Sequence, residues 1–490
     1  MMFTSLPSHL ALTLLVALDS FSSSGGLSSA APSPNAQPLS VPLLRRYTQP
    51  QNVTELGAWA RNQRIAIETK YGIRPPVDKR SNGMNLLTNQ NADSSYFGSI
   101  AVGTPPVSYD VILDTGSADF WLAASDSEGS NIESDIPRFS PPGSSSFVTQ
   151  NASFSIRYGS GAAQGTLGSD VIQMAGFEVQ NQVFGVVSQV SENMLNPPVS
   201  GILGLAWENI ATSQVKPFWQ VLAQTEGLLD EPVMAFQLTR YIDAPRVRSA
   251  EPGGTFTLGA TNSSLYEGDI DYQNIPDGSV GYWILEMSSL LVQNQNLSLP
   301  EDASFAAIDT GTTLVGGPAG VIQAIYSAIP GSSAATGEYE GYYTYPCSTT
   351  VTISLGFGNS TIRWPIEPAA FRLARLSADT CLGGFFELSS SGSSAPNWIV
   401  GDVFLKNVYS VFRASSPPAI GFATLSSTAL AMNGEGGPLP SPTIASSAAA
   451  VTATGVGIDR ASSAATRIYS TPMGAMLLAV ASTLILKLLQ

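Results

Sequence analysis

The sequence predicts an all-β protein with two similar lobes, and three observations lead to this prediction. The 490-residue chain contains 45 Gly and 33 Pro together with many Val, Thr and Ser, a composition typical of strands and turns. Only two segments show a clear amphipathic helical pattern. Two apolar runs, at 111–117 (VILDTGS) and 305–312 (FAAIDTGT), end in Asp-Thr-Gly followed by a hydroxyl residue. Their repetition predicts that each lobe presents one carboxylate.

The carboxylates of Asp114 and Asp309 are the first candidates for chemistry. One such stretch alone is explained by a strand that ends in an Asp-x-Gly turn, where Asp accepts backbone N–H bonds. By average residue usage, one D-T-G-[ST] arises by chance with a probability of about one in a hundred in a chain of this length. Two copies behind apolar runs, 195 positions apart, indicate a paired function.

The composition excludes several catalytic classes. The one histidine, His9, lies in a predicted signal segment, so a mature chain without it cannot use a Ser-His-Asp, Cys-His or H-E-x-x-H site. Two cysteines cannot form a four-cysteine zinc site. We therefore expect no metal and no cofactor, and acid–base chemistry by carboxylates and water. Two carboxyl groups a few Å apart share a proton, so one can act as base while the other donates.

The motifs resemble those of the pepsin-like aspartic proteases, over roughly residues 94–425. The two Asp-Thr-Gly-[Ser/Thr] motifs are similar to the paired active-site motifs of that family. Other segments match the family in the same order: a flap hairpin at 155–172, two apolar segments with Gly behind the catalytic loops at 200–207 and 397–412, and the strand that opens the second lobe at 281–290.

The resemblance implies a bilobed pepsin-like fold with an active-site cleft between lobe one (about 81–275) and lobe two (about 276–425). It implies catalysis by Asp114 and Asp309, with a flap over the site and apolar pockets beside the scissile bond. The supporting residues are Thr115, Gly116, Ser117, Thr310, Gly311 and Thr312; the flap residues are Tyr158, Gly159 and Ser160; the pocket residues are Ile112 and Tyr282. We expect a monomer that acts on proteins or peptides, and the acidic charge argues against nucleic acid.

The local patterns agree with this architecture. FSIRYG (154–159) alternates apolar and polar residues, and GSGAAQG (159–165) predicts a glycine-rich turn, so the two form a hairpin. One helix is predicted in KPFWQVLAQTEG, with Phe218, Val221 and Leu222 on its apolar face. A second is predicted in GPAGVIQAIYSAI near Pro318, and its apolar face comprises Ile322, Ile325, Tyr326 and Ile329.

The N-terminal region has a different character from the core. Residues 1–30 predict a signal peptide, because 10–18 (LALTLLVAL) is an apolar run too short to span a membrane. Residues 31–80 predict a propeptide that ends at Lys79-Arg80, although such a pair can also be merely solvated. The whole chain has a net charge of −15 at pH 7. Residues 31–80 contribute +5 and residues 1–30 contribute −1, so the net charge of residues 81–490 is −19. Such an acidic body favours work at low pH.

Lys70 is the candidate for a zymogen contact. The segment ETKYGI around it resembles propeptide segments of fungal aspartic proteases. The Lys70 ammonium could bridge the two catalytic carboxylates until acid weakens the pair. The alternative is a solvated lysine on a propeptide helix.

Cys347 and Cys381 are the only cysteines, and in a secreted chain they predict one disulfide. It would close a loop of about 35 residues and contribute roughly 3–4 kcal/mol in the loop-entropy model. Pepsin-like proteases carry a disulfide in this part of the second lobe, whereas the small first-lobe disulfide common in the family is missing here. Glycosylation sequons occur at Asn52, Asn151, Asn262, Asn296 and Asn359.

The C-terminal region predicts a surface anchor. Residues 426–472 read as a Ser/Thr/Ala-rich stalk, and residues 473–490 form an apolar tail interrupted by Lys487. This order is typical of a removable GPI signal with attachment at Ser462 or Ser463. A retained transmembrane helix is the alternative, which the short uninterrupted run and the absence of a basic segment after it make less favourable.

These observations favour a secreted aspartic endopeptidase, made as a zymogen and held at the cell surface. A non-catalytic pepsin-fold binding protein is the alternative class, and a structural surface glycoprotein is a third. A decayed copy should have lost an Asp-Thr-Gly motif or the flap tyrosine, whereas all are present. A structural glycoprotein would explain the stalk but not the paired aspartates.

Overall fold

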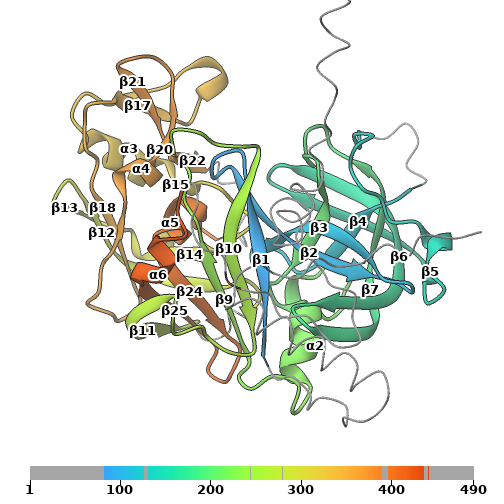
Figure 1. Ribbon diagram of the computed structural model, residues 1–490. Coiled ribbons are helices and arrows are strands. Elements are labelled where there is room, and N and C mark those ends of the chain that lie inside the picture. The colour runs from blue at the N-terminus through green and yellow to red at the C-terminus, as the bar shows by residue number, and fades with distance from the viewer. Residues whose placement is uncertain are drawn as a thin grey trace, which may run out of the picture. The chain divides into compact units, whose positions relative to one another are not determined.

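The computed structural model describes residues 82–125, 131–242, 244–276, 278, 280–388, 396–434 and 440. In this part of the chain, strands predominate and the helices are few and short, so the prediction of a bilobed pepsin-like all-β fold is confirmed (Figure 1). The described part contains no helix that is both long and apolar enough to cross a membrane.

The largest sheet has thirteen strands and includes both early and late parts of the chain. Two late strands, β24 (Val408–Arg413) and β25 (Ala419–Leu425), lie beyond the expected lobe boundary near residue 275. Even so, β24 pairs with β9 (Val233–Leu238) and β25 pairs with β11 (Tyr266–Asn274). In spatial order the strands are β11 (Tyr266–Asn274), β25 (Ala419–Leu425), β24 (Val408–Arg413), β9 (Val233–Leu238), β10 (Ala250–Leu258), β1 (Gly83–Gln90), β2 (Ser95–Val102), β3 (Val107–Asp114), β8 (Val199–Gly204), β4 (Phe120–Ala123), β7 (Phe177–Val190), β6 (Gly161–Met174) and β5 (Val148–Tyr158).

Two smaller sheets complete the strands of the second half. The eight-stranded sheet contains β19 (Trp364–Ile366), β18 (Ile353–Phe357), β12 (Ile284–Val292), β14 (Phe305–Ile308), β23 (Trp398–Val400), β15 (Val315–Pro318) and β22 (Phe385–Leu388), with β13 (Gln295–Leu297) paired to β12. The four-stranded sheet contains β16 (Ser333–Ala334), β17 (Tyr343–Pro346), β21 (Thr380–Gly383) and β20 (Arg372–Arg375).

The described helices are short and lie between strands. The α-helices are α2 (Phe218–Gln224), α3 (Ala319–Ser327), α4 (Pro368–Phe371), α5 (Asp402–Leu405) and α6 (Ser427–Leu430). Single 3₁₀ turns occur at η1 (Pro141–Gly143), η2 (Glu208–Ile210), η3 (Glu301–Ala303) and η4 (Gly337–Tyr339).

Both predicted amphipathic helices form, and the buried face differs from the predicted one only in the first. In α2 the buried residues include Trp219, whereas Val221 is only half-buried. Trp219 turns inward because its ring packs against two other tryptophans and its Nε1 donates to the carbonyl of Ala206 at 2.9 Å. In α3, Ile329 is buried as predicted but lies beyond the last helical residue, and Pro318 is both the last residue of β15 and the residue that precedes the helix.

The predicted flap hairpin is β5 and β6, but its turn is shorter than the sequence indicates. Tyr158 pairs with Gly161, so only two residues connect the strands. Gly161 and Gly165 belong to β6 and not to the turn, and β7 lies very close to β6 at Gly165. A Cβ placed on Gly165 would be 2.0 Å from the Val186 carbonyl oxygen, so glycine here permits close strand approach.

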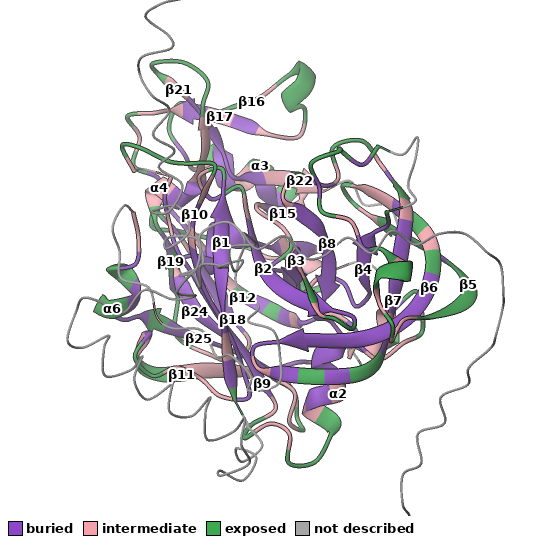
Figure 2. Ribbon diagram, turned by 45° about the vertical axis from the view of Figure 1, so that its right-hand side comes forward, coloured by how far each residue is buried: buried purple, intermediate pink, exposed green. Residues whose placement is uncertain are grey.

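The core runs through the strands that carry the catalytic loops. Figure 2 shows burial along nearly the whole length of β1, β2 and β8. Beside β8, the rings of Trp207 and Trp283 have centroids 4.9 Å apart, and Trp219 packs against both. The Trp283 Nε1 donates to the carbonyl of Leu205 at 2.9 Å. These contacts stabilise the segment directly behind the first Asp-Thr-Gly loop.

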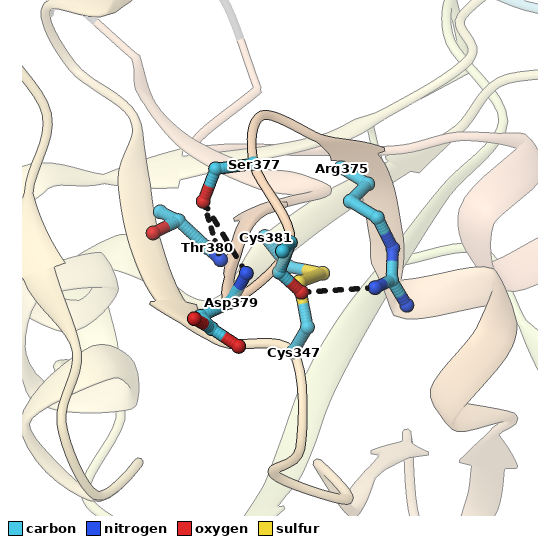
Figure 3. The surroundings of a disulfide bond; sticks show 7 residues. Cys347, Arg375, Ser377, Asp379, Thr380 and Cys381 are labelled. Atoms are coloured by element: carbon cyan, nitrogen blue, oxygen red, sulfur yellow. Dashed lines mark hydrogen bonds between the residues drawn. A yellow bond between two sulfur atoms is a disulfide. The ribbon is translucent and has the colours of Figure 1, made fainter.

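The predicted disulfide between Cys347 and Cys381 is present (Figure 3). It joins residues 34 positions apart, one immediately after β17 and the other in β21, which pair with each other. Beside it, Arg375 donates to the carbonyl of Ala378 at 3.0 Å and the Ser377 hydroxyl accepts from the Thr380 N–H at 3.0 Å (Figure 3). The disulfide thus ties the end of β17 to β21, beside the exposed turn between β20 and β21.

Candidate active site

Each catalytic aspartate stands at the end of a strand that pairs in parallel with a strand ending near glycine. Asp114 is the last residue of β3, opposite Gly204 at the end of β8. Asp309 follows β14, which pairs in the same way with β23. The Leu205 N–H donates to the Asp114 carbonyl at 2.7 Å, and the Asp309 N–H donates to the Val400 carbonyl at 3.0 Å. The second strand of each pair therefore fixes the backbone of the aspartate.

Each carboxylate is held by one backbone and one hydroxyl donor. The N–H of Gly116 donates to Oδ1 of Asp114 at 2.8 Å, and the Ser117 hydroxyl donates to Oδ2. Around Asp309 the arrangement repeats, with Gly311 N–H at 2.8 Å and the Thr312 hydroxyl at 2.6 Å. The Asp114 carboxyl group also lies within hydrogen-bonding reach of the Asp309 carboxyl group.

The two loops are also bonded to each other through Thr115 and Thr310. The N–H of Thr115 donates to the Thr310 hydroxyl at 3.1 Å, and the N–H of Thr310 donates to the Thr115 hydroxyl at 3.0 Å. Each hydroxyl in turn donates to the opposite strand, Thr115 to the Ile308 carbonyl at 2.8 Å and Thr310 to the Leu113 carbonyl at 2.6 Å. Because both threonines are buried, this crossed set of hydrogen bonds fixes how far apart the loops lie.

The glycines of both motifs allow the two carboxyl groups to meet. A Cβ on Gly116 would lie 2.6 Å from the carboxyl atoms of Asp309, and a Cβ on Gly311 would lie 2.3 Å from Oδ1 of Asp114. Each carboxyl group therefore packs against the glycine of the other loop, where any side chain would collide with it.

Burial raises the pKa of Asp114 well above the usual range of an aspartate, and the neighbouring Asp309 carboxyl raises it further. The bonds from Ser117 and Gly116 oppose this effect. Asp114 is 6 % exposed and Asp309 is 8 % exposed, so water screens their interaction poorly. The pair is suited to hold one proton in common.

The predicted flap and pocket residues lie around these carboxyl groups. The Tyr158 hydroxyl accepts a hydrogen bond from Nε1 of Trp121 at 2.8 Å, and burial followed by the Asp114 charge raises the pKa of Tyr158. Burial and the charges of Asp309 and Asp114 also raise the pKa of Tyr282. Ile112 is half-buried and packs with Tyr158 against a cluster of buried apolar side chains. Gly159 and Ser160 form the turn that follows Tyr158.

Two features of the site were not predicted from the sequence. Trp121 positions the flap tyrosine. In the sequence, the only feature that could have indicated this role is an aromatic residue seven positions after Asp114. Asp402 is buried beneath the second loop, and its N–H donates to the Thr312 carbonyl at 2.9 Å. The sequence feature that could have indicated this residue is a carboxylate inside an otherwise apolar segment, N-W-I-V-G-D-V-F.

The remaining predicted residues lie on the surface or outside the described residues. Asn151, Asn296 and Asn359 are exposed, and Asn262 is half-buried. Asn52, Lys70, Lys79, Arg80, Ser462 and Ser463 lie outside the described residues. Within the described ranges, no three His, Cys, Asp or Glu side chains gather in a way that could hold a metal ion.

Comparison with known proteins identifies the family. The model of the eukaryotic aspartyl protease family matches residues 95–425. Major aspartyl peptidase 1 of Cryptococcus neoformans var. grubii is 39% identical over 430 residues, covering 81% of this chain and 86% of that protein. The aspartic protease of Phaffia rhodozyma is 34% identical over 355 residues, covering 70% of this chain and 80% of that protein. Cathepsin D of Homo sapiens is 31% identical over 371 residues, covering 72% of this chain and 86% of that protein.

The chain belongs to the eukaryotic aspartyl protease family. It is an aspartic-type endopeptidase, as the sequence motifs predicted, and not a binding protein that has lost the catalytic constellation.

Replacing Thr115 or Thr310 by Val should lower both stability and activity. Valine keeps the shape but leaves two buried backbone groups without a partner, which costs about 2–4 kcal/mol of unfolding free energy. The serine variants Thr115→Ser and Thr310→Ser keep the hydroxyl and serve as matched controls. Urea unfolding and kcat are the measurements. Valine variants as stable and active as the serine variants would contradict the role of the crossed hydrogen bonds.

Proposed function

We propose that the protein is a secreted aspartic endopeptidase, made as a zymogen, which hydrolyses peptide bonds at acidic pH with a water activated by Asp114 and Asp309. The observation that carries this proposal is the pair of buried carboxyl groups, each bonded to its own loop and packed against the glycine of the other. Both carboxyl groups come from one chain, which supports action as a monomer on protein or peptide substrates. The acidic charge speaks against nucleic acid as a partner.

The chemistry follows from one shared proton. The ionised carboxyl group takes a proton from the water, whose oxygen forms a bond to the scissile carbonyl carbon. The protonated carboxyl group donates its proton to the carbonyl oxygen, which gives a neutral tetrahedral diol. When the C–N bond breaks, the departing nitrogen takes the proton from the protonated carboxyl group, and the ionised carboxyl group takes a proton from a hydroxyl of the diol, which becomes the new carboxylic acid. The dyad therefore returns to the one-proton state. No covalent bond to the protein forms at any step.

Several features support a working range at acidic pH. The dyad needs one proton, and burial together with the Asp309 charge raises the pKa of Asp114, so the proton is retained in mild acid. Residues 81–490 carry a net charge of −19 at neutral pH, and protonation of carboxylates reduces the resulting self-repulsion. Activity should fall as the pH rises past the point at which the dyad loses its last proton.

Replacing either catalytic aspartate by asparagine should abolish activity. Asp114→Asn and Asp309→Asn keep the shape but remove the proton exchange, so kcat should fall by about three orders of magnitude or more. Asp269→Asn, the same change at an exposed residue of β11, is the matched control. Peptide hydrolysis at several pH values is the assay. Substantial activity in Asp309→Asn, or inhibition by a chelator but not by a statine-type analogue, would contradict the mechanism.

The zymogen proposal concerns the basic segment 31–80, which lies outside the described residues. Its net charge of +5 precedes an acidic body, so the two attract each other at neutral pH. Lys70 is the group that we assign to the catalytic carboxylates, where its ammonium would occupy the place of the water. Protonation of the carboxylates in acid removes this attraction and releases the segment, and Lys79-Arg80 provides a site for processing.

The variant Lys70→Met tests this latency. We expect the precursor to hydrolyse a peptide substrate at near-neutral pH, because the apolar side chain cannot pair with the dyad. Lys70→Arg keeps the positive charge and should remain latent. The measurement compares the activity of uncleaved precursors, checked by intact mass. Full latency in Lys70→Met would assign the inhibition to another residue.

We also propose that the enzyme is held at the cell surface by a glycolipid attached to the carboxyl end of Ser462 or Ser463, after removal of the residues that follow the attachment site. Small residues, a polar spacer and an apolar tail support this proposal. Exposed sequons at Asn151, Asn296 and Asn359 fit passage through the secretory pathway. The part of the 426–472 segment that precedes the attachment site would then act as the stalk between the catalytic region and the membrane.

Phosphatidylinositol-specific phospholipase C should release active enzyme from intact cells if the anchor is a glycolipid. A variant in which both Ser462 and Ser463 are replaced by bulky residues should not be retained at the surface by such a lipid. The released protein is analysed by peptide mass mapping. A mature surface protein that still contains peptides from residues 473–490 would contradict the lipid anchor and indicate a retained helix.

A further inference from the structure

A carboxyl group that the mechanism does not use lies beneath the second catalytic loop. Asp402 is the first residue of α5, and it is 2 % exposed. Its N–H donates to the Thr312 carbonyl at 2.9 Å, and the Thr312 hydroxyl donates to Oδ2 of Asp309 at 2.6 Å. A single residue therefore connects Asp402 with the catalytic carboxylate.

The first half of the molecule has no such group at the corresponding position. β8 and β23 each lead to a glycine that lies behind a catalytic loop, Gly204 and Gly401. A Cβ on Gly204 would be 2.4 Å from the backbone of Ala118, and a Cβ on Gly401 would be 2.0 Å from the Thr312 carbonyl oxygen. The residue after Gly204 is the apolar Leu205, whereas the residue after Gly401 is Asp402. The dyad is thus nearly symmetric in its own bonds but asymmetric in what lies behind it.

The carboxyl group of Asp402 shares its neighbouring positive charge, Lys406, with a second carboxyl group. The ammonium of Lys406, whose side chain is 3% exposed, pairs with Oδ2 of Asp93 at 3.2 Å. Asp93 also accepts hydrogen bonds at 2.7 Å from Asn89 and from the Tyr241 N–H, so its carboxyl group is held by donors other than the lysine. Among the described residues, nothing donates a hydrogen bond to Oδ1 of Asp402.

Three titratable groups act on Asp402, and two of them come from other parts of the fold. They are Lys406 on the same short helical segment, Asp309 on the catalytic loop and Asp93 in the turn between β1 and β2. Tyr96 of β2 faces Asp93 and Asp402, and Arg240 faces Tyr96. Burial raises the pKa of Asp402 well above the usual range, Lys406 opposes this, and Asp309 and Asp93 add to it.

We propose that Asp402 is a positioning residue whose carboxyl group exchanges protons in concert with the dyad, so that the acid–base unit contains three carboxyl groups and not two. It acts through Asp309, from the interior side of the loop, and touches no substrate. A negative charge on Asp402 opposes loss of the last proton from the dyad, and ionisation of the dyad opposes ionisation of Asp402. This coupling extends the active range toward higher pH. The inference rests on the proposed dyad mechanism.

The pH profile of Asp402→Asn tests this coupling. Asparagine removes the charge with little change in shape, so the basic limb of kcat/KM should move to lower pH by about one unit. Activity on the acidic plateau should remain close to that of the unchanged enzyme. Val403→Ala is the matched control, because it loosens the packing of the neighbouring buried residue without changing a charge, and its limb should not move. An unmoved limb in folded Asp402→Asn would overturn the proposal.

A second measurement applies even if Asp402→Asn fails to fold. The assigned carboxyl carbon of Asp402 is titrated by NMR in the unchanged enzyme and in Asp309→Asn. Coupling is reciprocal, so Asp402 should lose its proton at lower pH when position 309 carries no charge. Identical titration of Asp402 in both proteins would overturn the proposal. Failure of this coupling proposal can be told apart from failure of the dyad mechanism, because the latter would show as an active Asp309→Asn enzyme.

Discussion

The close opposition of two carboxyl groups is the constraint on which the rest of the active site depends. Two buried carboxylates repel each other, so a fold that holds them together must fix both backbones firmly and supply donors to both side chains. The crossed hydrogen bonds of Thr115 and Thr310 fix the backbones. Gly116 and Gly311 leave the space in which the carboxyl groups meet, and their N–H groups provide one donor each.

The surrounding fold makes this arrangement rigid. Each catalytic loop is continuous with a buried strand, and each strand pairs in parallel with a second one that passes behind the loop. In the first half, the indoles of Trp219 and Trp283 donate to the carbonyls of Ala206 and Leu205 just after that second strand. Burial then has an electrostatic consequence, because it raises the proton affinity of Asp114 and so allows one proton to be held between two carboxyl groups.

The sequence predicted the features that repeat or that follow a simple period. The two Asp-Thr-Gly motifs, the apolar strands before them and the flap hairpin could be predicted because each has a local signature. The disulfide could be predicted because the chain contains only two cysteines. The inward turn of Trp219 was not, because it depends on Trp207 and Trp283, which are distant in sequence. The length of the flap turn was misjudged for a similar reason, since Gly165 serves the approach of β7 and not a turn.

Interactions between the two halves could not be read from either half alone. The crossed hydrogen bonds join residues 195 positions apart, and Asp93 and Lys406 are 313 positions apart. Asp402 carried only the weak signal of an acid in an apolar segment, and its relation to Asp309 became clear from the hydrogen bond to Thr312. The ordinary rule that a buried carboxylate needs a partner identifies such a residue as unusual, but only the fold shows which group it faces.

The central claim is that Asp114 and Asp309 hold one proton between them, and neutron diffraction of the deuterated enzyme in mild acid tests it most directly. The account predicts a single deuteron on the facing oxygens of the two carboxyl groups. It also predicts deuterons on the hydroxyls of Ser117 and Thr312, directed at the outer oxygens. A dyad with no deuteron, or with one on each carboxyl group, would contradict the account.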